Sequence, residues 1–301
     1  MSLRKPLAIA VALTAMALSA CGQAPVTETT LDVNTDVVST IPKDDSIAGL
    51  LPEEVRSSGV LRFGSAIGTP PGGFFVEGRP QPVGLDVDIA DAVARVLGVR
   101  VEREDAAFET ILPALGSGKY QVGTGNFGVT EERKKTIDFV TYVNDGQGFA
   151  VRKDSDLPEV TDITQLCGRT IGTGAGTTFE STLNSQRHRC AETGRPEYQV
   201  QVFSEQSALF SALNQGKVDV LMSTINGLRY GVSQQPNLKF LNEFRRLDVG
   251  FALKKESPLA PALQAAVNKL IQDGSYQRIL QKWGTGSSAI AQSQLSPPEI
   301  R

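Results

Sequence analysis

Residues 84–97 read GLDVDIADAVARVL, and no other stretch of the chain narrows the possible architectures as far. Acidic side chains early in this stretch favour the positively polarised start of a helix, and Gly98 follows as a stop signal. The apolar residues expected on its buried face are Ile89, Val93, Val96 and Leu97. The stretch therefore predicts an amphipathic helix, which on its own is compatible with many folds.

Short apolar strands and amphipathic helices alternate on both sides of this helix. We expect strands at 60–64, 170–172 and 218–222, and helices at 108–115, at 178–185 and from a cap at Ser204 to Gly216. The strand at 218–222 is nearly all apolar, which is typical of a parallel sheet buried on both faces. The alternation predicts α/β lobes with ligand sites at the carboxyl ends of strands.

Composition sets limits on function. The chain has 301 residues, 40% of them hydrophobic, which is enough for one large domain or two ordinary ones. The net charge of -3 gives no electrostatic case for nucleic-acid binding. His188 is the single histidine, and no His/Cys/Asp cluster has metal-ligand spacing. We therefore expect no metal, no cofactor and no Ser-His-Asp or Cys-His catalytic site.

The first 20 residues have the form of a secretory signal peptide. A basic start is followed by an apolar run at 7–17, which is short for a membrane span, and small residues precede Cys21. The placement of Cys21 resembles the lipobox of bacterial lipoproteins, which implies a lipidated N-terminus at Cys21 and a protein anchored outside the cell membrane. An ordinary cleaved signal that happens to contain a cysteine is the alternative.

The ends of the mature chain lack any helical or strand period. Residues 21–52 are rich in Thr, Val, Asp and Pro, and residues 286–301 are rich in Ser, Gln and Pro. We expect a lipidated flexible tether at the start and a flexible tail at the end. If Cys21 carries lipid, Cys167 and Cys190 remain as a pair that would form a disulfide in an oxidising compartment, unless they are two independent buried thiols.

Five further blocks follow residues 84–97 in order. They are 108–115 (FETILPAL), 130–133 (TEER) with 138–142 (DFVTY), 166–178 (LCGRTIGTGAGTT), 216–221 (GKVDVL) and 282–284 (KWG). Together the blocks resemble the family 3 extracellular solute-binding proteins of ABC transporters, which bind polar amino acids and related compounds. The resemblance covers nearly all of residues 55–285.

This resemblance implies a type II periplasmic-binding-protein fold: two α/β lobes, mixed sheets flanked by helices, and a two-strand hinge. We expect lobe 1 at 53–147 plus 249–285 and lobe 2 at 148–248, with crossovers near 146–151 and 247–251. The implied function is extracytoplasmic capture of an amino acid or a related carboxylate or amine, by cleft closure, and delivery to ABC permease subunits. We expect a monomer and no enzymatic activity.

The resemblance also implies a site for the ligand's carboxylate. Arg133 matches the family's carboxylate-binding arginine, whose planar guanidinium can form two parallel hydrogen bonds. Gly128 and Thr178 match positions whose backbone N–H groups reach the same carboxylate, and Gly176 lies in the turn before Thr178. Phe108 matches an aromatic wall of the cleft, although a residue of the core beside Ile111 is the alternative.

The amine half of the site departs from the family pattern. An aspartate that usually binds the α-ammonium is Thr224 here, and another acid of the first β–α loop is Ala66. Asn126 stands where a small residue is frequent. Because an unpaired buried ammonium is unfavourable, another acid such as Glu109 or Glu180 supplies the charge, or the ligand lacks an α-ammonium.

Two other functions remain compatible with this fold. Some relatives are cyclohexadienyl dehydratases, in which glutamates in the cleft would serve as general acid or base. A lipoprotein of this form would alternatively sense a ligand by docking on a membrane receptor. Conversion of the ligand would identify the enzyme, and neighbouring permease and ATPase genes would identify the transporter.

Overall fold

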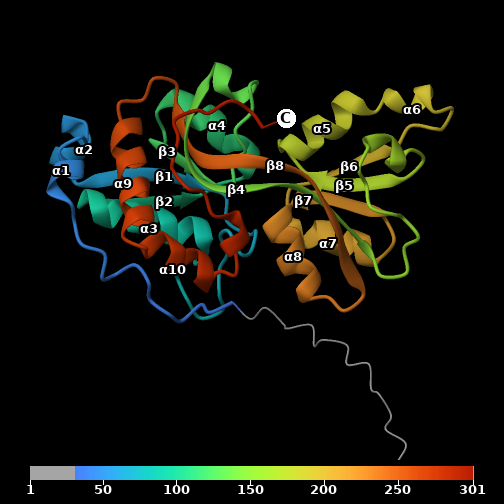
Figure 1. Cartoon of the computed structure of the whole chain (residues 1–301), viewed down its shortest axis with the longest axis horizontal. Coiled ribbons are helices and arrows are strands. Elements are labelled where there is room, and N and C mark those ends of the chain that lie inside the picture. Colours follow the sequence, from blue (N-terminus) through green and yellow to red (C-terminus); the bar gives the residue numbers. More distant parts are fainter. Residues whose placement is uncertain (1–30, 301) are drawn as a thin grey trace, which may run out of the picture.

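The structure is a computed structural model that describes residues 31–300. Two α/β lobes lie side by side (Figure 1), joined by the two longest strands, β4 (Ile137–Arg152) and β8 (Leu238–Lys254). The predictions of a signal peptide and of lipidation at Cys21 concern residues outside the described range. Within that range no helix is long and apolar enough to cross a membrane.

Lobe 1 contains the elements at the two ends of the chain, and lobe 2 contains the elements between β4 and β8. The elements of lobe 1 are α1 (Asp45–Ala48), α2 (Glu53–Ser58), β1 (Val60–Ser65), α3 (Leu85–Leu97), β2 (Arg100–Asp105), α4 (Phe108–Ser117), β3 (Val122–Thr124), η1 (Arg133–Lys135), α9 (Ala260–Gln272), α10 (Ser275–Lys282) and η3 (Gly286–Ser288). Those of lobe 2 are η2 (Ile163–Leu166), β5 (Thr170–Gly174), α5 (Thr178–Gln186), α6 (Arg189–Glu192), β6 (Gln199–Phe203), α7 (Gln206–Asn214), β7 (Val220–Thr224) and α8 (Ile225–Ser233).

The eight strands of residues 31–300 form one mixed sheet in the order β2-β1-β3-β8-β4-β7-β5-β6. β4 and β8 are antiparallel and each extends through both lobes, so the sheet is continuous across the hinge. The crossover falls where Gly146 pairs with Arg246. Gly146 has a φ of 149°, and a Cβ there would lie 2.1 Å from the Arg245 carbonyl oxygen, so only glycine fits this crossing.

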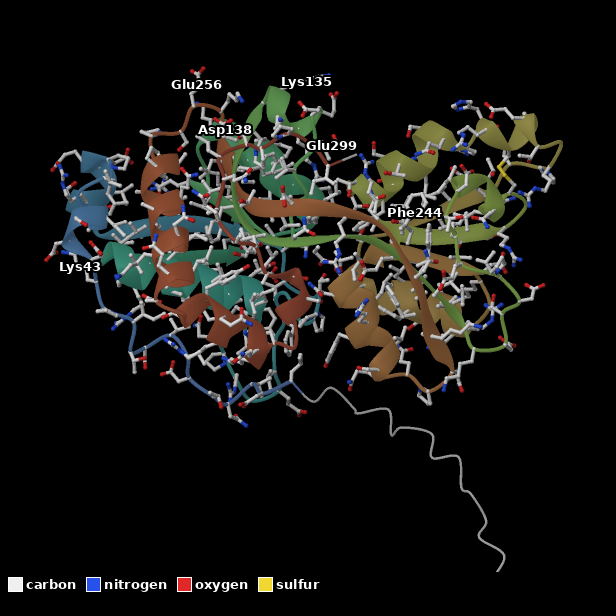
Figure 2. The ribbon with its side chains drawn as sticks, viewed as in Figure 1. Lys43, Lys135, Asp138, Phe244, Glu256 and Glu299 are labelled. Carbon is white, nitrogen blue, oxygen red and sulfur yellow. A yellow bond between two sulfur atoms is a disulfide. The ribbon has the colours of Figure 1, made fainter. Side chains whose placement is uncertain are left out.

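The predicted helix at 84–97 is confirmed as α3. Its four expected core residues are at most 1% exposed, and Gly98 ends it in the left-handed conformation. Cys167 and Cys190 form the predicted disulfide of lobe 2, with a Cα–Cα distance of 5.6 Å (Figure 2). One capping prediction is wrong: Glu205, not Ser204, precedes α7, and its side chain makes no capping hydrogen bond.

The segment before α2 differs from the expected flexible tether in the part that the structure describes. Ile41 and Leu51 are buried in the core of lobe 1. The Asp44 side chain accepts hydrogen bonds from the first turn of α1, and the Arg95 guanidinium donates to the carbonyl oxygen of Ser39. Scattered apolar residues anchor this segment, which is why no periodic pattern revealed its packing.

Residues 286–300, here called the C-terminal strap, were expected to be a flexible tail but lie along β4. The Ser293 hydroxyl donates to the Thr141 carbonyl oxygen at 2.6 Å, and the Ser296 N–H donates to the Phe139 carbonyl oxygen at 2.8 Å. Lys134 donates to the carbonyl oxygen of Pro297. The strap is held by polar groups, and its composition therefore resembled that of a disordered tail.

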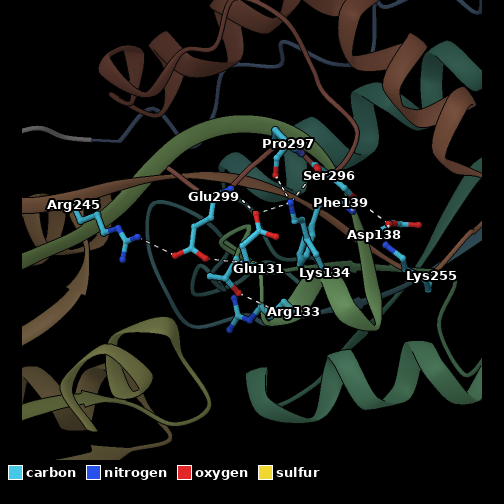
Figure 3. A network of polar contacts seen from close by, with 11 residues as sticks. Glu131, Arg133, Lys134, Asp138, Phe139, Arg245, Lys255, Ser296, Pro297 and Glu299 are labelled. Carbon is cyan, nitrogen blue, oxygen red and sulfur yellow. Dashed lines mark hydrogen bonds and ion pairs between the residues drawn. The ribbon is translucent and has the colours of Figure 1, made fainter. Parts of the chain in front are cut away.

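The strap also reaches lobe 2. Near its start, the Asn226 side chain on α8 donates to the Ser288 hydroxyl at 2.8 Å. Near its end, the Glu299 carboxylate accepts from the Glu131 N–H of lobe 1 at 2.8 Å and pairs with Arg245 of β8 at 3.0 Å (Figure 3). Figure 1 shows the last described residues between the two lobes. The strap is thus a connection between the lobes beyond the two hinge strands.

Candidate functional site

A cavity of about 310 Å³ lies between the lobes, at the low end of the range for small-molecule sites. Its lobe 1 wall comes from residues after β1, β2 and β3, and its lobe 2 wall from residues around the ends of β5, β6 and β7. The lobes are in contact around it. A Cβ on Gly176 would lie 2.8 Å from that of Glu109, and a Cβ on Gly68 would lie 3.9 Å from the Glu205 carboxylate. This arrangement is a closed cleft.

Arg133 links the two lobes at the edge of this cavity. It opens η1, where its guanidinium donates to the Gly128 carbonyl oxygen of lobe 1 at 3.1 Å and to the Gly176 carbonyl oxygen of lobe 2 at 3.1 Å. Two of its five N–H groups are used in this way, and three remain. Gly128 and Gly176 are therefore acceptors for the guanidinium in this structure, and neither lines the cavity.

No described carboxylate lies within ion-pair distance of the Arg133 guanidinium. Burial lowers the pKa of Arg133 to about 10, which still leaves it charged at neutral pH. The guanidinium lies 5.7 Å from the ring centre of Phe108 and 5.8 Å from that of Phe127. A cationic group among aromatic rings, without a charged partner in the described chain, is suited to an anionic ligand group.

Phe108 combines the two roles considered for it. Its ring stacks on the fully buried Phe127 with centroids 4.5 Å apart, and its half-buried side chain also lines the cavity. Thr178, the first residue of α5, lines the opposite wall, and Thr177 before it caps the helix. The N–H groups of a first helical turn lack intrahelical partners, so this wall can receive an anion.

The polar residues expected near the ligand's amine also line the cavity. The Thr224 hydroxyl caps α8 by accepting from the Gly227 N–H at 3.0 Å. Asn126 has a left-handed backbone, with a φ of 61°, and its amide nitrogen donates to the buried carboxylate of Asp145 at 2.8 Å. Such a conformation in a residue other than glycine is commonest for Asn and Asp, and it is enriched at functional sites.

The two acids proposed as substitutes have different positions. Glu109 lines the cavity, whereas Glu180 does not: its carboxylate accepts from the Gly176 N–H at 2.8 Å and so holds the turn before α5. Sequence reasoning missed two cavity acids, Asp105 and Glu205. Asp105 ends β2, where the carboxyl end of a parallel strand is a usable signal, and Glu205 was passed over in favour of Ser204 as the cap.

Two further carboxylates are buried behind the cavity wall. Burial raises the pKa of both Asp86 and Asp145 to about 6. Asp86 accepts a hydrogen bond from the Tyr142 hydroxyl at 2.8 Å, and the backbone N–H of Asn126 also lies against it. Across residues 31–300 there is no group of three or more His, Cys, Asp or Glu side chains placed to hold a metal ion.

Comparisons with known proteins give a consistent result. The family model for bacterial extracellular solute-binding proteins, family 3, matches residues 61–286. The arginine-binding protein ArgT of Corynebacterium glutamicum is 27% identical over 79% of this chain and 78% of its own length. The glutamine-binding protein GlnH of Bacillus subtilis is 30% identical over 66% of this chain and 72% of its own. The solved structure of an ancestral arginine-binding protein bound to arginine is 33% identical, with a TM-score of 0.68, covering 75% of this chain and 98% of that one.

Proposed function

Since this chain belongs to the bacterial extracellular solute-binding proteins of family 3, we propose that its ligand is an amino acid with a cationic side chain. The chain has the type II periplasmic-binding-protein fold and is a binding protein rather than an enzyme, like the named relatives. It captures a solute for an ABC importer. What we propose is the identity of the solute and the side chains that bind it.

The carboxylate end of the ligand would bind at Arg133. The three N–H groups that the guanidinium does not use and the first turn of α5 at Thr178 offer donors from both lobes. An α-carboxylate placed there would be bonded by lobe 1 and lobe 2 at once, so it would bind the closed cleft better than the open one. The half-buried face of Phe108 would cover the aliphatic part of the ligand.

The negative charge of the cavity wall is the observation that supports a cationic side chain on the ligand. Three acids, Asp105, Glu109 and Glu205, line the cavity against the single cation Arg133. Glu205 makes no capping bond to α7, so its carboxylate is available to the ligand. The buried amide oxygen of Gln206 beside it has no hydrogen-bond partner in the described chain and is suited to an N–H donor. A neutral side chain would leave the excess negative charge unbalanced.

We also propose that the mature protein is a monomeric lipoprotein anchored at Cys21 and that it docks on ABC permease subunits. The signal-like residues 1–20 and the lipobox-like position of Cys21 support the anchor. In cells expressing the full-length chain, the protein is expected in the membrane fraction, and Cys21→Ala is expected to move it to the soluble fraction. An unchanged distribution would contradict lipid anchoring.

A ligand panel tests the proposed solute. Thermal melting of the purified protein is measured with L-arginine, L-lysine, L-glutamine and L-cystine. A ligand at 100 times its Kd is expected to add about 2.7 kcal/mol to the free energy of unfolding. We expect the cationic amino acids to stabilise the protein most, and Glu205→Gln to reduce this preference, whereas the matched control Glu192→Gln on the outer surface of lobe 2 leaves it unchanged. Equal stabilisation by L-glutamine and L-arginine would refute the side-chain proposal.

A further inference from the structure

We propose that Asp145 supplies the negative charge that balances the ligand's α-ammonium group and that it acts through Asn126 as a positioning residue. This inference rests on the proposed function. The cavity acids Asp105, Glu109 and Glu205 are assigned to the ligand's side chain, and Ala66 and Thr224, at the family's ammonium-binding positions, present no charge to the cavity. An ammonium without a counter-charge of its own is unfavourable. The carboxylate of Asp145 lies behind the cavity wall and is joined to the wall residue Asn126 by a hydrogen bond.

Asp145 is a fully buried carboxylate at the hinge. It lies on β4 immediately before the crossover at Gly146, and its side chain is 0% exposed. One oxygen accepts from the Asn126 amide nitrogen of lobe 1 at 2.8 Å, and the other accepts from the Asn226 N–H of lobe 2 at 3.2 Å. The Asp145 carboxylate therefore lies behind Asn126, on the side of that residue that faces away from the cavity.

The bond to Asp145 fixes the orientation of the Asn126 amide. An ionised carboxylate only accepts hydrogen bonds, so the NH2 group of Asn126 must face Asp145, and its carbonyl oxygen is left for other donors. Asn126 lines the cavity, and its left-handed backbone is held by Asp86 at the N–H. The negative charge behind it polarises the amide, which makes this oxygen a stronger acceptor for an ammonium.

The charge of Asp145 is not neutralised by an ion pair in the described chain. Arg246 of β8 is the cation that faces it, but that guanidinium pairs with Glu243 at 2.8 Å. Tyr142 of β4 is affected by the charge of Asp145 and is hydrogen-bonded to Asp86 of α3, and neither of these two groups is a cation. Burial raises the pKa of Asp145 to about 6, so the carboxylate is mostly ionised at neutral pH. A cation in the cavity would complete the site.

The competing explanation is that Asp145 only latches the closed lobes together, since it bonds Asn126 of lobe 1 and Asn226 of lobe 2. Two ligands distinguish a counter-charge for the ammonium from a latch between the lobes. They are L-arginine and δ-guanidinovalerate, which is arginine without the α-ammonium. A latch contributes equally to the binding of both probes. A counter-charge for the ammonium contributes to the binding of L-arginine alone.

The test is calorimetric titration of both probes into the wild type, Asp145→Asn and the swapped double variant Asn126→Asp/Asp145→Asn. We expect Asp145→Asn to weaken L-arginine binding roughly tenfold to a hundredfold and to change the Kd of δ-guanidinovalerate little. The double variant keeps the hydrogen bond and moves the carboxylate to the wall, so it should restore L-arginine binding. Equal weakening of both probes, or no recovery in the double variant, would overturn the inference.

A measurement on the wild type keeps the test decisive if Asp145→Asn does not fold. At about pH 6, an ammonium beside Asp145 favours its ionised form, so L-arginine should release a proton on binding and δ-guanidinovalerate should not. Titration in two buffers of different ionisation enthalpy measures this difference, and equal proton release by both probes would overturn the inference. Failure of the wild type to bind L-arginine at all would instead refute the proposed function.

Discussion

Replacing Arg133 by alanine removes both a cross-lobe contact and the cation of the cavity. In the wild type the guanidinium donates to the carbonyl oxygens of Gly128 and Gly176, one in each lobe, at 3.1 Å. Alanine leaves both acceptors without this donor and leaves the ligand's carboxylate without its cationic partner. Lysine keeps a charge but provides a single donor centre, so it cannot span both lobes and the ligand together.

The magnitude follows from the number and type of bonds lost. A hydrogen bond to a charged group contributes about 1.5–3 kcal/mol, and removing one partner of a buried charged pair costs about 3–5 kcal/mol. Arg133→Ala is therefore expected to raise the Kd by roughly a hundredfold to a thousandfold or more. Arg133→Lys, which keeps the charge, is expected to raise it by about tenfold.

Calorimetric titration with L-arginine measures these changes. The matched control is Arg100→Ala, which removes an exposed arginine at the start of β2, at the opposite end of this strand from the cavity residue Asp105, and should leave the Kd unchanged. Circular dichroism and thermal melting establish that each variant is folded. An Arg133→Ala protein that binds L-arginine within threefold of the wild type would show that the ligand's carboxylate is held elsewhere, and the account of the site would be wrong.

Three further predictions follow from other parts of the molecule. Glu205→Gln is expected to weaken L-arginine binding by about 1.5–3 kcal/mol, as for a hydrogen bond to a charged group, while L-glutamine binding changes little; equal losses would point to a folding defect in α7. Glu299→Gln removes the partly exposed ion pair between the strap and Arg245, worth about 1 kcal/mol, and should speed ligand release up to about fivefold in stopped-flow fluorescence; an unchanged rate would exclude the strap from closure. Burial raises the pKa of Asp145 to about 6 from 3.8, so the contribution of this group to stability is full below pH 3.8 and is lost as the pH rises through about 6. The melting temperature of the unliganded wild type relative to Asp145→Asn should therefore fall over this interval, by the equivalent of about 3 kcal/mol. A constant difference between the two melting temperatures would contradict the burial of this charge.

The helices and strands that were predicted carry their own periodic or apolar patterns. Residues 84–97 place apolar side chains at helical spacing, and Gly98 supplies the left-handed residue that ends α3. The strap and the segment around Ile41 were not predictable in this way. They form no regular element, and what fixes them is contact with β4 and α3, which are distant in the sequence.

The residues of the candidate site also divide into those that could be named from the sequence and those that depend on distant contacts. Arg133, Phe108, Asn126, Thr178 and Thr224 were named from the resemblance to the family, and the structure brings them to one cavity or its edge. Asp105, Glu205 and Asp145 were missed because their significance depends on which lobe they face after closure. Asp145 lies within a strand, where an acid suggests a solvated edge, and only the pairing of β4 with β7 and β8 shows that it is buried.

The position of Ile300 has a practical bearing on how this protein is handled. Because the Ile300 carbonyl oxygen accepts from the Arg245 guanidinium at 2.9 Å, a purification tag or fluorescent fusion appended there would be attached directly beside the junction of the lobes. Affinities measured on such fusions would then include a perturbation of the opening equilibrium, whereas a tag placed near the start of the described chain would leave this junction free.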